Sequence, residues 1–249
     1  MSWEISFFTR EQFKNHVYKT VLNYTKVLEP MNLEKFNSNL IDPIKLTFDS
    51  KVYGKDIESI IVDEIARQRD KSNTNTIGYF HQNLFKLIKG CIVPEHGFDV
   101  IYKRNDGRTV YVELKNKHNT MNSSSSQKTF MRMQNQLLKD PSCLCYLVEV
   151  IASKSQNIKW NVSLDSESTS DERIRRVSID KFYEEITGDK TAFKKICDVL
   201  PEIIEEIVEE NNEFTLGKDI VLFQLYQNNP DILKSLYLLA FSTYEGFKI

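Results

Sequence analysis

The spacing of apolar residues predicts helices in the outer parts of the chain and strands in its centre. Apolar positions recur every three to four residues in the outer parts, and Pro30 and Gly90 stand where two of these patterns stop. The predicted helices cover about 10–29, 56–70, 76–89, 127–139, 179–187 and 190–210, with more helix towards the C-terminus. Runs typical of strands cover 98–104, 109–115 and 143–151. The pattern indicates an α/β fold in a single domain, with a mixed central sheet flanked by helices.

Two segments have no clear period. Residues 116–126 form a polar stretch before the helix at 127–139, and Ser125 or Ser126 is the expected N-cap of that helix. Residues 152–172 are rich in Ser, Asn and Asp, so we expect irregular structure that includes a short strand near Trp160.

The loop of the central hairpin decides which side chains share a face. The turn at 105–107 allows a two-residue type I′ loop or a three-residue loop with Gly107 in the left-handed bulge position. A two-residue loop would pair Asp99 with Leu114 and place Glu113 among apolar side chains. A three-residue loop pairs Asp99 directly with Glu113 and leaves the other face uniformly apolar, so we expect this register. That apolar face carries Phe98, Val100, Tyr102, Val110, Val112 and Leu114.

The expected register places two carboxylates and an ammonium group together. Carboxylates that face each other in antiparallel strands repel unless a cation or a proton lies between them. Asp99 and Glu113, with backbone oxygens and water, make an oxygen-ligand site for Mg²⁺, in which Leu114 is the third candidate residue. Lys115 points to the same side and can orient an attacking water. The alternative is a solvated strand face with a chance acid pair.

Composition places the chain among ordinary globular proteins. Its 249 residues are 41% hydrophobic and 27% charged, with a net charge of −2. No apolar run approaches the roughly 18 residues of a membrane span, and the N-terminus lacks the regions of a signal peptide. The four cysteines lack metal-site spacing. We therefore expect a cytoplasmic protein with no membrane association.

Basic residues gather in one part of the sequence. Residues 103–139 contain eight basic and two acidic side chains, whereas residues 198–213 contain seven acidic and no basic ones. The basic region could face an anion that the acidic region repels, although the net charge argues against a generic nucleic-acid coating protein. Chance segregation of charge along amphipathic helices explains the pattern equally well.

Asp99, followed after thirteen residues by Glu113-Leu114-Lys115, resembles the D…(D/E)xK signature of the PD-(D/E)xK nuclease superfamily. Phe98 departs from the pattern, because proline is common at that position. The stretches VELKNKHNTMNSSSSQKTF and RQRDKSNTNTIGYFHQNLF resemble a group of Type II restriction endonucleases that cut GGNCC-type sites. Together they lie within a span of about 65 residues near the middle of the chain.

The resemblance implies a Type II restriction endonuclease with a PD-(D/E)xK core. It implies Asp99 and Glu113 as Mg²⁺ ligands and Lys115 as the catalytic lysine. The partners would be a short palindromic site in double-stranded DNA, a second copy of the chain, and a cognate DNA methyltransferase in the same bacterium. The expected single nuclease domain, 1–249, has its catalytic core over about 55–151 and a helical C-terminal portion over about 179–249. The alternatives are a structure-selective repair or recombination nuclease and a non-catalytic DNA-binding module.

The family also implies a further acid on a helix in many members. An inward stripe of isoleucines runs along the predicted helix at 56–70, and Glu64 falls inside it. The stripe consists of Ile57, Ile60, Ile61 and Ile65. A carboxylate on such a face needs a partner or a metal. We expect Glu64 to be an auxiliary catalytic acid; the alternative is a glutamate at the edge of the stripe that pairs with a lysine.

Polar and basic side chains around the expected site are candidates for contacts to DNA. They lie at the end of the helix at 56–70, in the loop at 116–126 and on the exposed face of the helix at 127–139. The candidates are Arg67, Lys71, Lys117, His118, Asn119, Asn122, Ser123, Lys128 and Arg132. A mobile Ser-rich surface loop is the alternative reading of 116–126.

Overall fold

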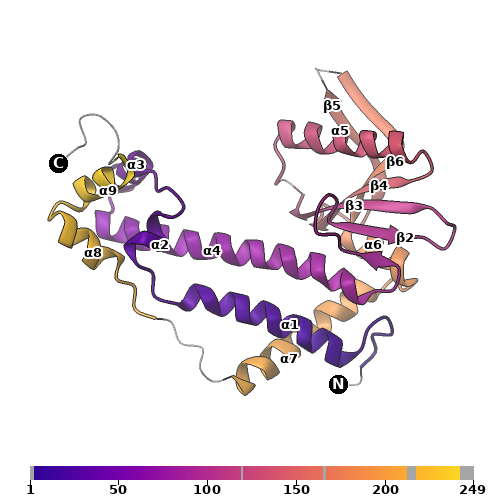
Figure 1. Cartoon of the computed structure of the whole chain (residues 1–249), viewed down its shortest axis with the longest axis horizontal. Coiled ribbons are helices and arrows are strands. Elements are labelled where there is room, and N and C mark those ends of the chain that lie inside the picture. Colours follow the sequence, from indigo (N-terminus) through magenta and orange to yellow (C-terminus); the bar gives the residue numbers. More distant parts are fainter. Residues whose placement is uncertain (1–2, 119, 165–166, 212–216, 242–249) are drawn as a thin grey trace. The chain divides into compact units, whose positions relative to one another are not determined.

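The computed structural model describes residues 3–118, 120–164, 167–211 and 217–241. Its contacts divide the chain into two compact units, each formed by two segments that are far apart in the sequence (Figure 1). The first unit comprises Met1–Val21 and Thr76–Glu210, and the second comprises Leu22–Asn75 and Asn211–Ile249. The single nuclease domain with a core over about 55–151 stays a prediction.

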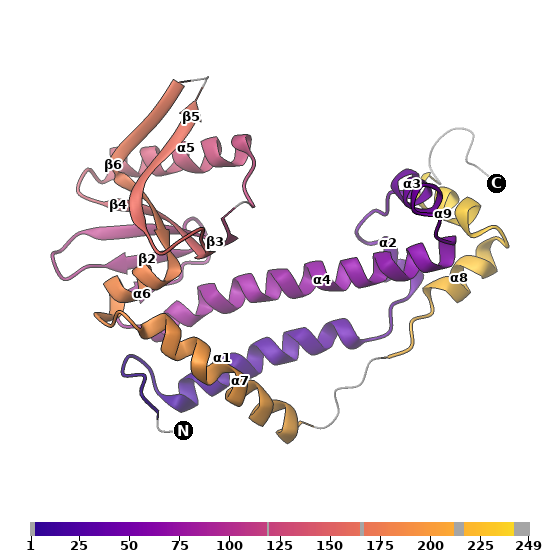
Figure 2. The same ribbon diagram turned by 180° about the vertical axis from the view of Figure 1, so that it is seen from behind.

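A mixed six-stranded sheet forms the centre of the first unit (Figures 1 and 2). Its strands are β1 (Cys91–Ile92), β2 (Val100–Lys103), β3 (Thr109–Lys117), β4 (Leu144–Ile151), β5 (Asn157–Leu164) and β6 (Glu167–Ser178). The order is β1-β2-β3-β4-β6-β5, and β3, β4 and β6 run parallel while the other neighbours are antiparallel. The carboxyl ends of β3, β4 and β6 therefore meet at one edge, and the predicted α/β class is confirmed.

Helices cover both faces of this sheet, because side chains along each strand alternate between two apolar clusters. On one face lies α5 (Ser123–Lys139), which buries Phe130, Met133 and Leu137. The other face packs against α1 (Arg10–Thr25), the last turns of α4 (Ile57–Leu84), the 3₁₀ turn Phe85–Leu87, α6 (Ile179–Thr187) and α7 (Ala192–Glu210). Among the described residues, no helix is both long and apolar enough to cross a membrane.

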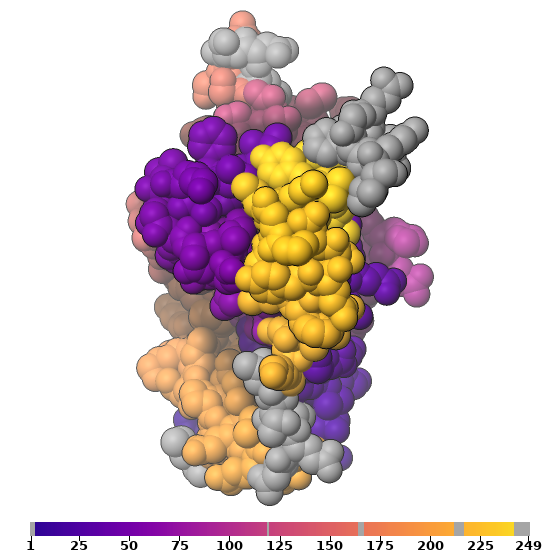
Figure 3. Space-filling view, turned by 90° about the vertical axis from the view of Figure 1, so that its left-hand side faces the viewer, coloured from indigo at the N-terminus to yellow at the C-terminus, as the bar shows by residue number. Residues whose placement is uncertain are grey.

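The second unit is helical and combines Leu22–Asn75 with the C-terminal segment that begins at Asn211. It contains the 3₁₀ turn Lys26–Leu28, α2 (Leu33–Asn37), α3 (Pro43–Tyr53), the first turns of α4, α8 (Val221–Asn228) and α9 (Ile232–Phe241). Figure 3 shows the C-terminal helices, in yellow, packed beside the purple segment that holds α2 and α3. Arg69 binds the carboxylate of Asp219 at 2.7 and 2.9 Å, and Asp219 accepts the backbone N–H of Met31 at 2.8 Å. These contacts fix the C-terminal segment to α4.

Helix α4 differs from the prediction of two helices over 56–70 and 76–89. It is continuous over 28 residues, Ile57–Leu84. The polar run at 71–75 contains neither proline nor glycine, and each Ser, Asn or Thr costs a helix only about 0.5 kcal/mol. The hydroxyl of Ser72 donates to the carbonyl of Gln68 at 3.1 Å, so its polar group is satisfied within the helix. Polar composition alone was therefore too weak to end the helix.

The segment 152–172 is also more regular than predicted. Strands β5 and β6 form an antiparallel pair that extends across it, and residues 165–166 lie outside the described part of the chain. Trp160, Val162 and Ile174 are buried against α5. The strand expected near Trp160 is confirmed. The irregular structure predicted around it was wrong, because polar residues between the apolar ones hid an alternation of period two.

Helix α5 begins four residues earlier than predicted. Its first residue is Ser123, and its N-cap is Asn122 rather than Ser125 or Ser126. The Asn122 side chain accepts the backbone N–H of Ser125 at 2.8 Å. Asparagine caps helices as well as serine does, so the four serines continue the helix instead of preceding it.

The three-residue loop of the central hairpin is confirmed. Val100 lies opposite Val112, and Lys103 lies opposite Thr109. The N–H of Arg104 donates to the carbonyl of Arg108 at 3.0 Å, and Gly107 has φ of 86°. One residue of the predicted apolar face was placed wrongly: Phe98 packs on the α5 side, with Tyr111. The strand begins only at Val100, so the alternation does not extend back to Phe98.

The left-handed backbone at Gly107 gives a prediction about stability. Gly107→Ala should lower the free energy of unfolding by about 1 kcal/mol, because an L-residue is strained at positive φ. Gly78→Ala is the matched control: it is in a helix, and its new Cβ would meet the Asn116 side chain at an ordinary 3.5 Å. We expect that variant to be neutral or up to about 1 kcal/mol more stable. Urea unfolding measures both; equal effects would contradict the strain at Gly107.

Candidate active site

Asp99 is held at the entrance of β2 by two hydrogen bonds to β3. Its backbone N–H donates to the carbonyl of Val112 at 2.9 Å, and its Oδ2 accepts the backbone N–H of Leu114 at 2.7 Å. Gln82 of α4 donates to the Asp99 carbonyl at 3.3 Å. Oδ1 accepts no hydrogen bond from any residue that the structure describes. The carboxylate therefore has a fixed direction and one oxygen available.

The surroundings of Asp99 raise the pKa of its carboxyl group, because the nearby positive charges do not offset its burial. Burial raises its pKa, and the nearby charge of Glu113 raises it further. The hydrogen bond from Leu114 and the charges of Lys115 and Arg132 act in the opposite direction without cancelling the rise. A cation close to this carboxylate would lower its pKa.

Glu113 lies between two basic side chains. Lys115 Nζ lies 2.8 Å from Oε1, and the guanidinium of Arg132, from α5, pairs with Oε2. The Arg132 guanidinium also lies over the ring of Phe98, 4.7 Å from its centroid. The Glu113 side chain is only 12% exposed, so these pairs balance a largely buried charge. Asp99, Glu113 and Lys115 are thus brought together as the hairpin register predicted.

The donor set suits a hard divalent cation bound mainly by water. Among the described residues no group of three or more His, Cys, Asp or Glu side chains is arranged around a common metal position. Mg²⁺ commonly binds proteins through one or two carboxylates and keeps several waters. Asp99 and Glu113 are two such carboxylates on one side of the hairpin, and their role as metal ligands stays a prediction. Leu114 lies between Glu113 and Lys115, gives its N–H to Asp99 and packs its side chain against the core.

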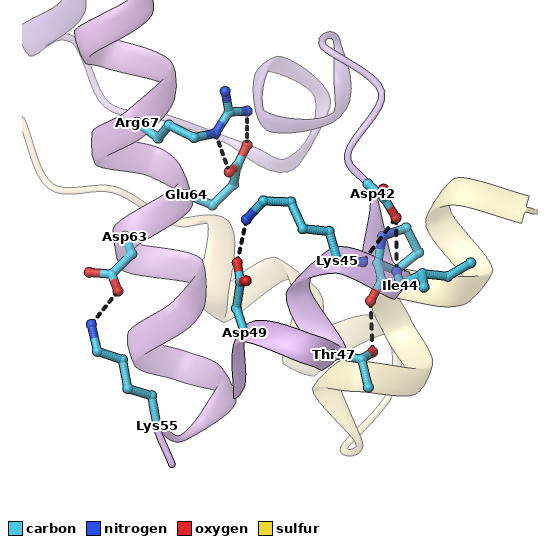
Figure 4. A network of polar contacts seen from close by, with 10 residues as sticks. Asp42, Ile44, Lys45, Thr47, Asp49, Lys55, Asp63, Glu64 and Arg67 are labelled. Atoms are coloured by element: carbon cyan, nitrogen blue, oxygen red, sulfur yellow. Dashed lines mark hydrogen bonds and ion pairs between the residues drawn. The ribbon is translucent and has the colours of Figure 1, made fainter. Parts of the chain in front are cut away.

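Glu64 lies in the second unit and already has partners there (Figure 4). It is 7% exposed; Arg67 donates to its two oxygens at 2.6 and 2.5 Å, and Gln68 donates at 3.1 Å. Burial acts to raise its pKa, but the hydrogen bonds from Arg67 and Gln68 outweigh burial and lower it. The inward position is as predicted, and an arginine rather than a lysine balances the charge. Its auxiliary catalytic role stays a prediction.

The candidates for DNA contacts fall into two groups. In the first unit the exposed side chains follow the end of β3 and the exposed face of α5: Lys117, His118, Asn122, Ser123, Lys128 and Arg132. In the second unit Lys71 is exposed, and Arg67 is engaged with Glu64. Asn119 lies outside the described residues. The roles of all these residues stay predictions.

Sequence reasoning missed a buried charge cluster beside Lys115. Glu149 of β4 is 1% exposed; His118 Nδ1 lies 3.1 Å from its Oε2, and Arg176 of β6 donates its Nε to Oε1 at 2.8 Å. Arg176 also donates to the backbone carbonyl of His118 at 2.9 Å. Glu149 lies opposite Lys115 in the parallel β3–β4 pair. The available signal was a lone carboxylate inside the apolar run CLCYLVEVI, since a buried strand carries a charge only with a partner.

Comparison with known proteins shows the family to which the chain belongs. The model of the Eco47II restriction endonuclease family matches residues 5–209. The Type II restriction enzyme Sau96I from Staphylococcus aureus is 32% identical over 232 residues, which cover 90% of this chain and 88% of the relative. The Type II restriction enzyme Eco47II from Escherichia coli is 26% identical over 215 residues, 83% of this chain and 89% of the relative. The chain belongs to the Eco47II restriction endonuclease family and is a site-specific deoxyribonuclease of the Type II restriction class.

Proposed function

We propose that the hairpin of β2 and β3 is the catalytic centre of this endonuclease and that its cofactor is Mg²⁺. Asp99 and Glu113 would hold the ion through their carboxylates, with the Leu114 carbonyl as a further oxygen ligand. When bound there, Mg²⁺ would supply Lewis acidity to the scissile phosphoryl group. The observation that carries the proposal is the register that puts Asp99, Glu113 and Lys115 on one side of the hairpin.

Lys115 would act on the attacking water and on the phosphate. Its ammonium group, held 2.8 Å from Glu113, can orient a water for attack on phosphorus. It also stabilises negative charge as this accumulates on the phosphoryl oxygens in the transition state. Glu64 is proposed as an auxiliary acid. The loop and helix residues Lys117, His118, Asn119, Asn122, Ser123, Lys128 and Arg132, with Arg67 and Lys71, are proposed to contact DNA.

The proposed substrate is a short palindromic site of the GGNCC type in double-stranded DNA, cut in the bacterial cytoplasm. A two-fold site is matched by a two-fold protein, so we propose a homodimer. A cognate methyltransferase would protect the host's own sites. Membership of a restriction endonuclease family favours fixed sites over a structure-selective nuclease or a non-catalytic DNA-binding module.

Digestion of a plasmid of known sequence tests this function. We expect discrete, reproducible fragments in the presence of Mg²⁺, none with EDTA, and a common palindrome when the fragment ends are sequenced. Sedimentation of the protein with and without a duplex carrying that palindrome tests the dimer. Fragments of random length would contradict a sequence-specific site, and cutting that persists in EDTA would contradict the metal.

Arg132 provides a test of the metal site that does not depend on cleavage. Its guanidinium pairs with Glu113 and so competes for the carboxylate that a cation would use. Arg132→Gln should bind Mg²⁺ roughly two- to fivefold more tightly than the wild type in the absence of DNA, as expected for loss of a partly exposed ion pair. Isothermal titration calorimetry measures the difference, with Lys128→Gln as the control on the same helix. Weaker Mg²⁺ binding by Arg132→Gln would contradict this competition.

A further inference from the structure

A cavity lies where the carboxyl ends of β3, β4 and β6 meet, next to Lys115. Its volume is about 200 Å³, and it is lined by side chains from all three strands, by Trp160 of β5 and by Ser126 in the first turn of α5. A water molecule takes about 30 Å³ of liquid volume, so the space suffices for a small anion and several waters. Ligands of open α/β sheets commonly bind outside the carboxyl ends of parallel strands.

The charges that line this cavity are mainly positive. Lys115, Lys117 and Arg176 contribute ammonium and guanidinium groups, and Glu149 is the acid among the described lining residues. Glu149 is 1% exposed, and both of its oxygens are engaged by Arg176 and His118. The negative charge of Glu149 is therefore balanced within the protein. A ligand in the cavity would face mainly the positive charges of Lys115, Lys117 and Arg176.

Two of these cations have donors to spare. Arg176 uses Nε and Nη2 on Glu149 and on the His118 carbonyl, and its Nη1 donates to no residue that the structure describes. The Lys117 ammonium group is exposed and has no acceptor within the described ranges. Glu149 thus holds the Arg176 guanidinium in place without using all of it. Such a fixed guanidinium suits the oxygens of a phosphate.

We propose that this cavity is a subsite for a backbone phosphate of the DNA, bound by Arg176 and Lys117 and adjacent to the phosphate that is cleaved. The inference rests on the proposed function for the choice of DNA as the source of the phosphate. Lys115 lines the cavity and also belongs to the proposed catalytic centre with Asp99 and Glu113. Lys117 lies two residues, about 6.6 Å, further along β3. One strand of DNA can therefore pass from the catalytic group to the cavity. Glu149 is a positioning residue, because it acts on DNA only through Arg176.

The salt dependence of DNA binding tests the subsite without relying on cleavage. The variants are Lys117→Gln and the double variant E149Q/R176Q, in which neutral amides replace the buried ion pair. Lys190→Gln, an exposed lysine before α7, is the matched control. Dissociation constants are measured in EDTA at several NaCl concentrations, on a duplex with the cleavage site and on one of unrelated sequence. Circular dichroism checks folding, and Lys117→Gln alone carries the test if the double variant does not fold.

We expect each test variant to lower the slope of log affinity against log salt by about 0.9, with binding about eightfold weaker at 0.1 M salt. Slopes equal to those of the wild type and of Lys190→Gln would overturn the subsite, even if the wild type cuts plasmid into discrete fragments. If the test variants show the lowered slopes but the wild type never cuts DNA, the proposed function is overturned instead.

Inorganic phosphate distinguishes a free anion from DNA as the ligand. If the cavity serves DNA, phosphate competes with the duplex only weakly, and both test variants keep the lowered slope. If Lys117→Gln abolishes binding of inorganic phosphate but leaves the slope for DNA unchanged, the cavity takes a free anion, and the assignment to DNA is overturned.

Discussion

Lys115→Met is expected to slow cleavage at the specific site by about 10²–10³-fold while leaving the protein folded and bound to its site. The ammonium group stabilises charge that develops only in the transition state, so its removal lowers kcat more than it weakens binding. Loss of one positive charge near DNA should weaken binding by at most about tenfold at 0.1 M salt. Single-turnover cleavage of a duplex with excess enzyme measures the chemical step, and a filter-binding titration measures affinity.

The matched comparison is Lys190→Met, which removes an exposed ammonium group elsewhere in the first unit. It should cut at the wild-type rate. Lys115→Arg keeps the charge and should recover part of the lost rate, because the position is 31% exposed and can accept a longer side chain. If Lys115→Met cuts as fast as Lys190→Met, Lys115 has no part in the chemistry, and the catalytic group must be sought elsewhere.

The hairpin could be predicted in detail because the alternation of apolar and polar residues in its two strands fits only one pairing register. A shift of one residue would move Glu113 into the face that buries Val110 and Val112. The free-energy cost of burying that carboxylate is large compared with any preference of the turn at 105–107 for a two-residue or a three-residue loop. The register, and with it the proximity of Asp99, Glu113 and Lys115, therefore followed from the apolar residues alone.

The parts that could not be predicted depend on weak or distant effects. The run at 71–75 differs from a good helix by small propensities, and burial on either side of it decides that α4 continues. The strands β5 and β6 pair in a segment whose apolar residues are few, and their burial depends on α5 packing over Trp160. The cluster of His118, Glu149 and Arg176 combines β4, β6 and the residue that follows β3. It depends on the strand order β3-β4-β6, which a local pattern in the sequence does not contain.

Asp99→Asn is expected to slow cleavage by about a thousandfold, roughly 4 kcal/mol of transition-state stabilisation, because it removes a carboxylate proposed to hold the metal. The same change should make the metal-free protein more stable at neutral pH. In the folded protein burial and the charge of Glu113 raise the pKa of Asp99. Asparagine keeps an oxygen that can accept the Leu114 N–H but carries no charge.

The sign of the stability change follows from proton linkage. An acid with a raised pKa in the folded state stabilises the protein fully below its unfolded pKa, and this contribution is lost as the pH rises through the folded pKa. Without metal, the midpoint of thermal unfolding of Asp99→Asn should therefore exceed that of the wild type at pH 7. The difference should shrink as the pH falls through the raised folded pKa of Asp99 and vanish below the pKa of an unfolded aspartate, about 3.9.

Adding Mg²⁺ should reverse the order of the two proteins. The ion stabilises the wild type by mass action, because it binds the folded state, whereas Asp99→Asn lacks one ligand and should gain little. Asp198→Asn, an exposed acid on α7 paired with Lys194, is the control and should respond to Mg²⁺ as the wild type does. If Mg²⁺ raises the unfolding midpoint of Asp99→Asn as much as that of the wild type, Asp99 is not a ligand. If metal-free Asp99→Asn is less stable than the wild type at pH 7, the charged Asp99 carboxylate does not destabilise the folded protein.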